Sequence, residues 1–106
     1  MEVIIKKSTK PKKKLMAIFY KDNKKIKTTH FGSAPNKDFT IYSKELDKQG
    51  AEKKKDAYIA RHRVRENFNA FMTSGSLSRW ILWNKPSVEA SIRDYLKRFK
   101  LRRRKA

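Results

Sequence analysis

Residues 15–31, LMAIFYKDNKKIKTTHF, contain two runs rich in β-branched and aromatic residues on either side of a short polar break. Leu15 to Tyr20 and Ile26 to Phe31 have the composition of strands, and Asp22-Asn23 between them is typical of a tight turn. A further run of this kind, Val3 to Ile5, precedes them. Together the three runs predict a small antiparallel meander in the N-terminal third.

Alternation within Ile26 to Phe31 assigns its side chains to the two faces of this sheet. Ile26, Thr28 and His30 share one face, which we expect to pack against the rest of the protein. The opposite face bears Lys25, Lys27, Thr29 and Phe31. A sheet that packs on one side then leaves a lysine-bearing face in water.

A helix is predicted from Glu52 to Phe68, because apolar residues recur there at steps of three and four. These residues are Ala57, Ala60, Val64 and Phe68. Before this helix, residues 32–37 and 42–50 are polar and contain turn-forming residues, so we expect two surface loops.

Two more helices are predicted toward the C-terminus. A short one covers Leu77 to Trp83 and ends before Pro86, whose ring cannot continue a helix interior. Pro86 then begins a last helix, whose apolar face follows steps of four, three and four. That face consists of Val88, Ile92, Tyr95 and Phe99.

The whole pattern predicts an α+β fold in which about three N-terminal strands pack with about three helices. We expect one basic domain of residues 1–99, followed by a flexible basic tail of residues 100–106.

The charge of the chain indicates the kind of partner that it binds. Its 106 residues include 29 Lys and Arg against 10 Asp and Glu, a formal net charge of +19, which favours an acidic partner. Cysteine is absent, which excludes disulfides, a thiol nucleophile and cysteine-ligated zinc. No apolar run is long enough to span a bilayer or to form the core of a signal peptide. We therefore expect a soluble or peripheral protein without a cofactor.

The positive charge is concentrated at the two ends of the chain and on the helix predicted from Glu52. Runs of this kind neutralise phosphates by counterion release, without sequence preference. The candidate polyanion-binding residues are Lys10, Lys12, Lys13, Lys14, Arg61, Arg63, Arg65, Arg98, Lys100, Arg102, Arg103, Arg104 and Lys105. Charge alone does not distinguish nucleic acid, with DNA as the expected form, from acidic protein or anionic lipid. A solvated charge run without a partner is the simpler alternative.

Tyr58, His62 and Glu66 follow one another at steps of four on the same predicted helix. They form either an acid or base site centred on His62 or, as we favour, a polar ladder that fixes the helix against its neighbours. His30 and Asp38 extend this cluster, which could hold a metal, yet no spacing here matches a metal-ligand motif. We therefore expect a buried, hydrogen-bonded His30, no metal and no catalysis.

Trp80 and Trp83 lie three residues apart in the predicted short helix. Exposed tryptophans can stack on bases, but a small domain needs its largest apolar side chains inside. We therefore expect both tryptophans to belong to the core.

Several short motifs occur in order along the chain and carry a resemblance to a known family. They are Lys27–Ser33 (KTTHFGS), Asp38–Thr40 (DFT), Tyr58–His62 (YIARH), Glu66–Asn67 (EN) and Leu77–Trp83 (LSRWILW). Over residues 27–99 the chain resembles small basic proteins of unknown function encoded by nucleocytoplasmic large DNA viruses of algae and protists. It departs from the family pattern in residues 42–53, where it carries extra residues, and at Ala34-Pro35.

The resemblance implies a viral source and two competing roles for a non-enzymatic virion protein. In the first, the basic residues bind genome phosphate without strong sequence specificity, in the virion or the infected cell. In the second, the protein is a minor capsid component that links acidic surfaces of capsid subunits, or links the capsid to an inner anionic membrane. Neither role involves a small-molecule substrate. A third role, as a metal-dependent nuclease, would use His30, Asp38 and His62.

Overall fold

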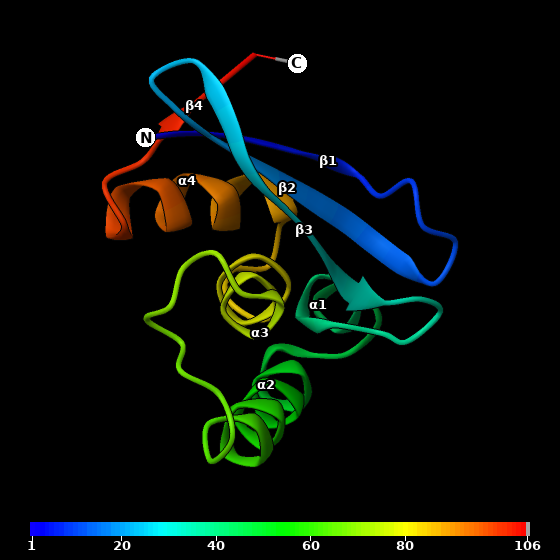
Figure 1. The fold of residues 1–106 in the computed structure, drawn as a ribbon. Coiled ribbons are helices and arrows are strands. Elements are labelled where there is room, and N and C mark those ends of the chain that lie inside the picture. Colours follow the sequence, from blue (N-terminus) through cyan, green and yellow to red (C-terminus); the bar gives the residue numbers. More distant parts are fainter. Residues whose placement is uncertain (106) are drawn as a thin grey trace.

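The computed structural model describes residues 1–105 and shows one sheet covered on one face by helices (Figure 1). Its elements in chain order are β1 (Glu2–Lys7), β2 (Lys13–Lys21), β3 (Lys24–Ser33), α1 (Phe39–Glu45), α2 (Lys48–His62), α3 (Ser74–Leu77), the π-helical turn η1 (Ser78–Leu82), α4 (Val88–Arg98) and β4 (Arg102–Arg103). The predicted α+β class and the N-terminal antiparallel meander are confirmed. Within the described residues, no helix has the length and apolar character needed to cross a membrane.

The sheet has the strand order β3-β2-β1-β4. β1, β2 and β3 pair antiparallel in chain order. The turn between β2 and β3 lies at Asp22-Asn23, where the φ angles of 52° and 64° are left-handed. Asp and Asn adopt this conformation more readily than other residues that carry a Cβ, which is why the dipeptide predicts the turn correctly.

The C-terminal tail contributes to the sheet, although it was predicted to be a flexible extension. Arg102 and Arg103 form β4, which pairs parallel to β1 opposite Glu2 and Val3. Leu101 immediately before them is buried in the core. This single apolar residue anchors an otherwise basic segment, because burying a leucine side chain contributes about 2 kcal/mol.

The faces predicted for β3 are reversed in the structure. Phe31 and Thr29 are buried on the side of the helices, whereas Ile26 is 46% exposed and His30 lies on the outer face. Burial of the large Phe31 ring outweighs burial of the smaller Ile26 side chain. Lys27, opposite Phe19, stays in water all the same, because residues 24–28 are exposed along their whole length. A register shift at Ile26 places Lys25 opposite Tyr20, on the outer face.

The helices form two layers beneath the sheet (Figure 1). α3, η1 and α4 lie directly under the strands, and α2 lies farther away, beyond α1. The core between the sheet and the helices contains the fully buried side chains of Val3, Phe19, Phe31, Leu77, Ile81 and Tyr95. The predicted apolar face of the last helix is confirmed by the burial of Ile92 and Tyr95, although α4 begins after the N-cap Ser87 and not at Pro86.

Two helices occupy the segment that was predicted to be a loop before Glu52. Asp38 caps the N-terminus of α1, and Asp47 caps that of α2, each through a side-chain oxygen that accepts backbone N–H groups. Such caps satisfy donors that the first turn leaves free, so a polar stretch can begin a helix here without an apolar stripe.

The predicted boundaries and packed face of α2 are also wrong. The helix begins at Lys48 and ends at His62, well before Phe68. Its buried residues are Ala51 and Tyr58, whereas Ala57, Ala60 and Val64 are exposed. Burial of the Tyr58 ring removes far more surface from water than burial of alanine methyl groups, so the tyrosine side of the helix faces the fold.

Hydrogen bonds hold the long loop between α2 and α3 against the core. Trp80 Nε1 and Ser76 Oγ both donate to the Phe68 carbonyl, each at 2.8 Å. The Tyr95 hydroxyl donates to the Phe71 carbonyl. These donors satisfy carbonyl groups that have no partner within a helix, so the loop can lie against the core without unpaired backbone groups at Phe68 and Phe71.

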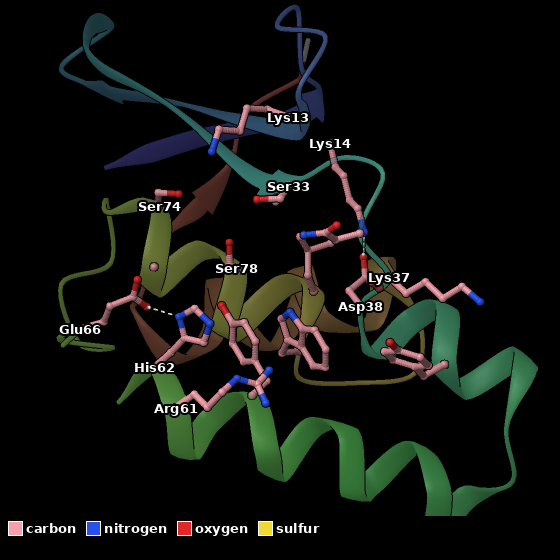
Figure 2. Close-up of a pocket in the computed structure, with 17 residues that line it drawn as sticks. Lys13, Lys14, Ser33, Lys37, Asp38, Arg61, His62, Glu66, Ser74 and Ser78 are labelled. Atoms are coloured by element: carbon pink, nitrogen blue, oxygen red, sulfur yellow. Dashed lines mark hydrogen bonds and ion pairs between the residues drawn. The ribbon is translucent and has the colours of Figure 1, made fainter. Parts of the chain in front are cut away.

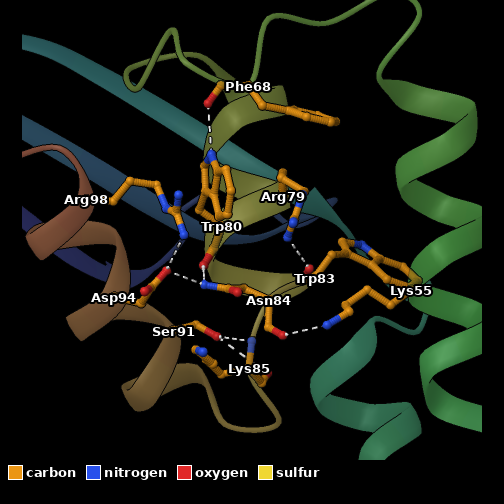
Figure 3. A network of polar contacts seen from close by, with 10 residues as sticks. All are labelled: Lys55, Phe68, Arg79, Trp80, Trp83, Asn84, Lys85, Ser91, Asp94 and Arg98. Carbon is orange, nitrogen blue, oxygen red and sulfur yellow. Dashed lines mark hydrogen bonds and ion pairs between the residues drawn. The ribbon is translucent and has the colours of Figure 1, made fainter. Parts of the chain in front are cut away.

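A second set of polar contacts fixes η1 against α4 (Figure 3). Asn84 Nδ2 donates to the Trp80 carbonyl at 3.1 Å and to Asp94 Oδ2 at 2.7 Å. Arg98 lies 3.4 Å from the same carboxylate oxygen, and its guanidinium lies 3.7 Å from the centroid of the Trp80 ring. Trp80 is therefore half-buried against the core, with Arg98 on its ring and Asn84 hydrogen-bonded to its backbone carbonyl.

Candidate nucleic-acid interface

A cleft of about 480 Å³ opens between the end of the sheet and the helices (Figure 2). One wall comes from the start of β2, the end of β3 and the segment that follows it, and includes Lys13, Lys14, Ser33, Lys37 and Asp38. The other wall comes from α2, α3 and η1, and includes Tyr58, Arg61, His62, Ser74, Ser78 and Trp83. The cleft thus gathers cations, hydroxyl groups and aromatic rings from segments far apart in the sequence.

Gly32 brings the two walls together at one end. Its φ angle of 80° is left-handed, and a Cβ atom at this position would lie 2.5 Å from Leu82 Cδ1 and 3.2 Å from Lys14 Cβ. Glycine alone combines this backbone conformation with so close an approach to η1. The glycine therefore sets how near the end of β3 lies to the helical wall.

Asp38 lines the cleft but is fully occupied by structural contacts. Its side chain is only 4% exposed and lies 2.7 Å from Lys14 Nζ through Oδ2. Its Oδ1 accepts from the Thr40 N–H at 2.9 Å and from the Thr40 hydroxyl. A carboxylate that accepts this many bonds stabilises the start of α1 and neutralises Lys14. It is not free to bind a ligand.

Three stacked rings, those of His62, Tyr58 and Trp83, line the helical wall of the cleft and form an aromatic column. The rings of Tyr58 and Trp83 stack with centroids 4.3 Å apart and planes at 5°, and His62 stacks on Tyr58 at 4.1 Å. Burial raises the pKa of the Tyr58 hydroxyl to about 12, with the charge of Glu66 adding to the shift and a hydrogen bond with Ser78 opposing it. Tyr58 and His62 of the predicted stripe thus lie between α2 and the end of η1, but the hydrogen-bonded ladder that the sequence favoured is not formed, and Glu66 follows the end of α2. Ring stacking holds α2 in place instead.

Glu66 reaches the cleft from the loop after α2. Its Oε2 lies 3.8 Å from His62 Nδ1, too far for a hydrogen bond, and this buried oxygen has no hydrogen-bond partner within residues 1–105. The carboxylate packs on Gly75, where a Cβ atom would lie 2.4 Å from Oε2. A side chain at position 75 would displace Glu66, so the glycine keeps the carboxylate at the edge of the cleft.

His30 does not join this cluster. It lies on the outer face of the sheet, where its Nδ1 is 2.7 Å from Ser8 Oγ. The hydrogen bond was predicted, but His30 is only partly buried and lies on the face opposite the one expected. The residues of the nuclease hypothesis, His30, Asp38 and His62, are therefore not brought together. Among the described residues, no group of three potential His, Cys, Asp or Glu ligands could hold a metal ion.

Two of the predicted binding residues line the cleft, and two more lie in the loop that precedes Lys13. Lys10 and Lys12 are exposed in the β1–β2 loop, which is tied to the cleft wall by a backbone hydrogen bond from Ala34 to the Lys12 carbonyl at 3.0 Å. Lys13 and Arg61 line the cleft itself from opposite walls. Arg63 and Arg65 were predicted on a helix, but they follow the end of α2 and are exposed.

The predicted binding residues of the C-terminal region have mostly internal contacts. Arg103 forms an ion pair with Glu89, and Arg104 Nη1 lies 2.9 Å from Glu2 Oε1 and 3.0 Å from Asn23 Oδ1. Arg98 is occupied by Asp94 and Trp80, whereas Lys100, Arg102 and Lys105 are exposed. The tail is therefore a partly neutralised edge of the sheet, and the free cations are concentrated elsewhere.

The Arg104→Gln variant is expected to lose about 1 kcal/mol of unfolding free energy, because it loses a half-exposed ion pair and a cation–π contact with Tyr20. Urea denaturation followed by circular dichroism measures the change. Arg102→Gln is the matched control, since Arg102 is exposed and its replacement removes the same charge. Equal effects of the two substitutions would contradict the role assigned to Arg104.

Several cleft residues were missed in the sequence. Trp83 was assigned to the core, Lys37 was placed in a predicted loop without a role, and Ser74 and Ser78 were given no role, although Ser78 lies in the LSRWILW motif. The signal that could have located this wall is the run of small residues from Thr73 to Ser76, with which α3 begins and which allows other side chains to approach closely.

Comparison with known proteins found no matching family model, curated protein or solved structure, so the resemblance to virus-encoded basic proteins stays a prediction.

Proposed function

We propose that this protein is a non-enzymatic nucleic-acid-binding protein, which holds the phosphate backbone along the rim of the cleft. The observation that supports this is a set of cations without acidic partners around one concave site. Within residues 1–105, six of the 29 Lys and Arg side chains form ion pairs. The basic rim, defined as Lys10, Lys12, Lys13 and Arg61, contains none of these six.

Phosphate is the ligand that relieves this charge most directly. Cations held together in a compact state repel one another, and a phosphate chain neutralises several of them while releasing its counterions. Within the basic rim, Lys13 and Arg61 line the cleft from opposite walls, so a strand can be held from both sides. Contacts to phosphate carry no sequence information, and binding without strong sequence specificity follows.

The carboxylates of the cleft support binding and not hydrolysis. Asp38 is saturated by Lys14 and Thr40, and Glu66 lies next to His62 without a hydrogen bond between them. A general acid and base pair would need groups that are free and in reach of one reacting atom. If the resemblance to viral proteins holds, the nucleic acid is the viral genome in the virion or the infected cell.

Duplex DNA affinity is expected to fall about a hundredfold between about 50 and 200 mM salt, because each of the four cations of the basic rim releases about one counterion on contact with phosphate. Replacing Lys10, Lys12 and Lys13 by glutamine should lower the slope of log affinity against log salt by about 3, because about one counterion is released per contact. Fluorescence anisotropy with a labelled duplex measures both quantities.

The control for this experiment replaces Lys44, Lys48 and Lys53 by glutamine. These lysines are exposed on or near α1 and α2, do not line the cleft, and carry the same total charge. The control should retain most of the salt slope. The proposal would be contradicted if the affinity of the native protein for duplex DNA did not change with salt, or if both triple variants lost the same part of the salt slope.

A second candidate function is the minor capsid role, and the free edges of the sheet favour it. β3 is an edge strand, and β4 covers β1 only at Glu2 and Val3. An extended segment with acidic side chains could pair with either edge, where lysines are frequent. Retention of the protein in purified virion shells after removal of the DNA would support this role, and loss with the DNA would contradict it.

A further inference from the structure

We propose that the cleft admits one unpaired nucleotide of a single strand, whose N–H or O–H donor hydrogen-bonds to the carboxylate of Glu66. The inference rests on the proposed function, because the basic rim must first hold the strand. It goes beyond phosphate binding, because a hydrogen bond at Glu66 would let the protein distinguish strands that differ in sugar or base.

The size of the cleft limits what can enter it. A volume of about 480 Å³ lies within the range of about 300 to 1,000 Å³ that is typical of small-ligand sites. A base that is paired and stacked in a duplex cannot reach the interior of such a cleft, so any nucleotide in it must be unpaired. The duplex can contact the rim, and only a single strand can place a residue inside.

The Glu66 carboxylate specifies what the ligand must supply. Glu66 lines the cleft with 34% of its side chain exposed, so a ligand in the cleft can reach its carboxylate. The carboxylate is short of donors, because its Oε2 has no hydrogen-bond partner among residues 1–105, and such a group is costly unless a ligand or a water molecule donates to it. A cationic ligand is disfavoured, because Lys13, Lys14 and Arg61 line the same cleft. The ligand therefore combines a neutral donor for Glu66 with negative charge for the cations, as a nucleotide does with its base or sugar and its phosphate.

The remaining lining fits the same ligand. Ser33 and Ser74 place hydroxyl groups on opposite walls, and each can donate to phosphate or accept from a sugar. Both faces of the Tyr58 ring are already stacked, on His62 and on Trp83. A base therefore cannot insert between these rings. Discrimination between strands then depends on the hydrogen bond to Glu66 and not on stacking. The side chain of His62, at the end of the column, is 40% exposed and can contact a base on one side.

Two parts of a nucleotide can supply the donor. A ribose has a 2′-hydroxyl, which is the group that distinguishes RNA from DNA, and guanine has neighbouring N–H groups that match a carboxylate. The experiment compares three single strands of about 12 nucleotides at fixed salt: oligo-dT, oligo-rU and oligo-dT with one central guanine. The thymines and uracils of all three strands are methylated at N3, because their N3–H groups would otherwise be donors themselves. Competition against a labelled strand, read by fluorescence anisotropy, gives the relative affinities.

The native protein is expected to bind one of the two donor-bearing strands about fivefold or more tightly than oligo-dT. Preference for oligo-rU identifies the ribose hydroxyl as the donor, and preference for the guanine strand identifies the base. Glu66→Met should abolish that preference. Gly75→Ala should weaken it as well, because the new methyl group displaces the carboxylate without removing its charge. Glu52→Met, the same substitution at a carboxylate of α2 that does not line the cleft, should leave the preference unchanged.

Equal affinity of the native protein for all three strands, or a preference that persists in Glu66→Met, overturns the inference. Duplex DNA binding with its salt dependence is measured in parallel. If duplex binding persists while the single-strand preference is absent, the inference fails and the proposed function stands. If no strand and no duplex binds even at low salt, the proposed function fails with it.

Discussion

Asp38→Ala is expected to lower the free energy of unfolding by about 3 kcal/mol, the largest loss from any single polar substitution in this fold. The substitution removes the N-cap of α1 and the acidic partner of Lys14 together. Lys14 is itself only 19% exposed, so its ammonium would remain partly desolvated without a counter-charge. Leaving one member of a buried pair uncompensated is more costly than losing both members.

Asp47→Ala is the matched control for this prediction. Asp47 also caps a helix, with its Oδ1 accepting from the Gly50 N–H at 2.8 Å, but it is exposed and has no cation within ion-pair distance in the described chain. Its loss should cost about 1 kcal/mol. Chemical denaturation of both variants separates the cap from the buried pair. The double variant Lys14→Met/Asp38→Asn should recover part of the stability lost in Asp38→Ala. Similar losses for Asp38→Ala and Asp47→Ala would contradict the assignment.

Raising the pH above 10 is expected to destabilise the protein through Tyr58 and Tyr95. Burial raises the pKa of both hydroxyl groups, that of Tyr58 to about 12, and Tyr95 is fully buried with its hydroxyl donating to the Phe71 carbonyl. The unfolded chain releases these protons near pH 10, whereas the folded protein keeps them to higher pH. The stability is therefore complete below pH 10 and falls as the pH rises, by about 2 kcal/mol for Tyr58 by pH 12.

Urea denaturation at several pH values between 9 and about 12 tests this prediction. Tyr58→Phe and Tyr95→Phe should each have a shallower loss of stability with pH than the native protein. Tyr20→Phe, on the outer face of the sheet, serves as the control. Because all variants keep the same lysines, the difference between them isolates the tyrosine contribution. Superimposable pH profiles for the native protein and the Tyr58→Phe and Tyr95→Phe variants would rule out this origin of alkaline sensitivity.

The strands and the last helix could be predicted because their signals are local. Leu15 to Tyr20 and Val3 to Ile5 are rich in residues that favour strands whatever lies around them, and α4 has an apolar face at regular steps. The beginnings of α1 and α2 depend on single capping carboxylates, whose bonds are not visible in a polar stretch of sequence. Residues 42–50 therefore resembled a loop.

The side of β3 that faces the core could not be predicted, because its two faces differ little in apolar content. Ile26 and Phe31 compete for burial, and the helices beneath the sheet decide between them. The cleft depends likewise on contacts between distant segments. Gly32 must approach Leu82, and Gly75 must leave room for Glu66, so neither glycine has a local signature of its role. Tyr58, His62 and Glu66 could be grouped by their spacing, but the wall that faces them could not.

The pairing of β4 with β1 can form only late, while the chain folds during its synthesis. The contact between Arg104 and Glu2 joins residues separated by 102 positions, so it forms only after nearly the whole sequence has left the ribosome. Until then the outer edge of β1 is bare, and a bare edge invites pairing between nascent chains. Lys6 and Lys7 are exposed on this strand and act as gatekeepers, because two copies that met there would bring like charges together. An acidic partner would meet no such barrier.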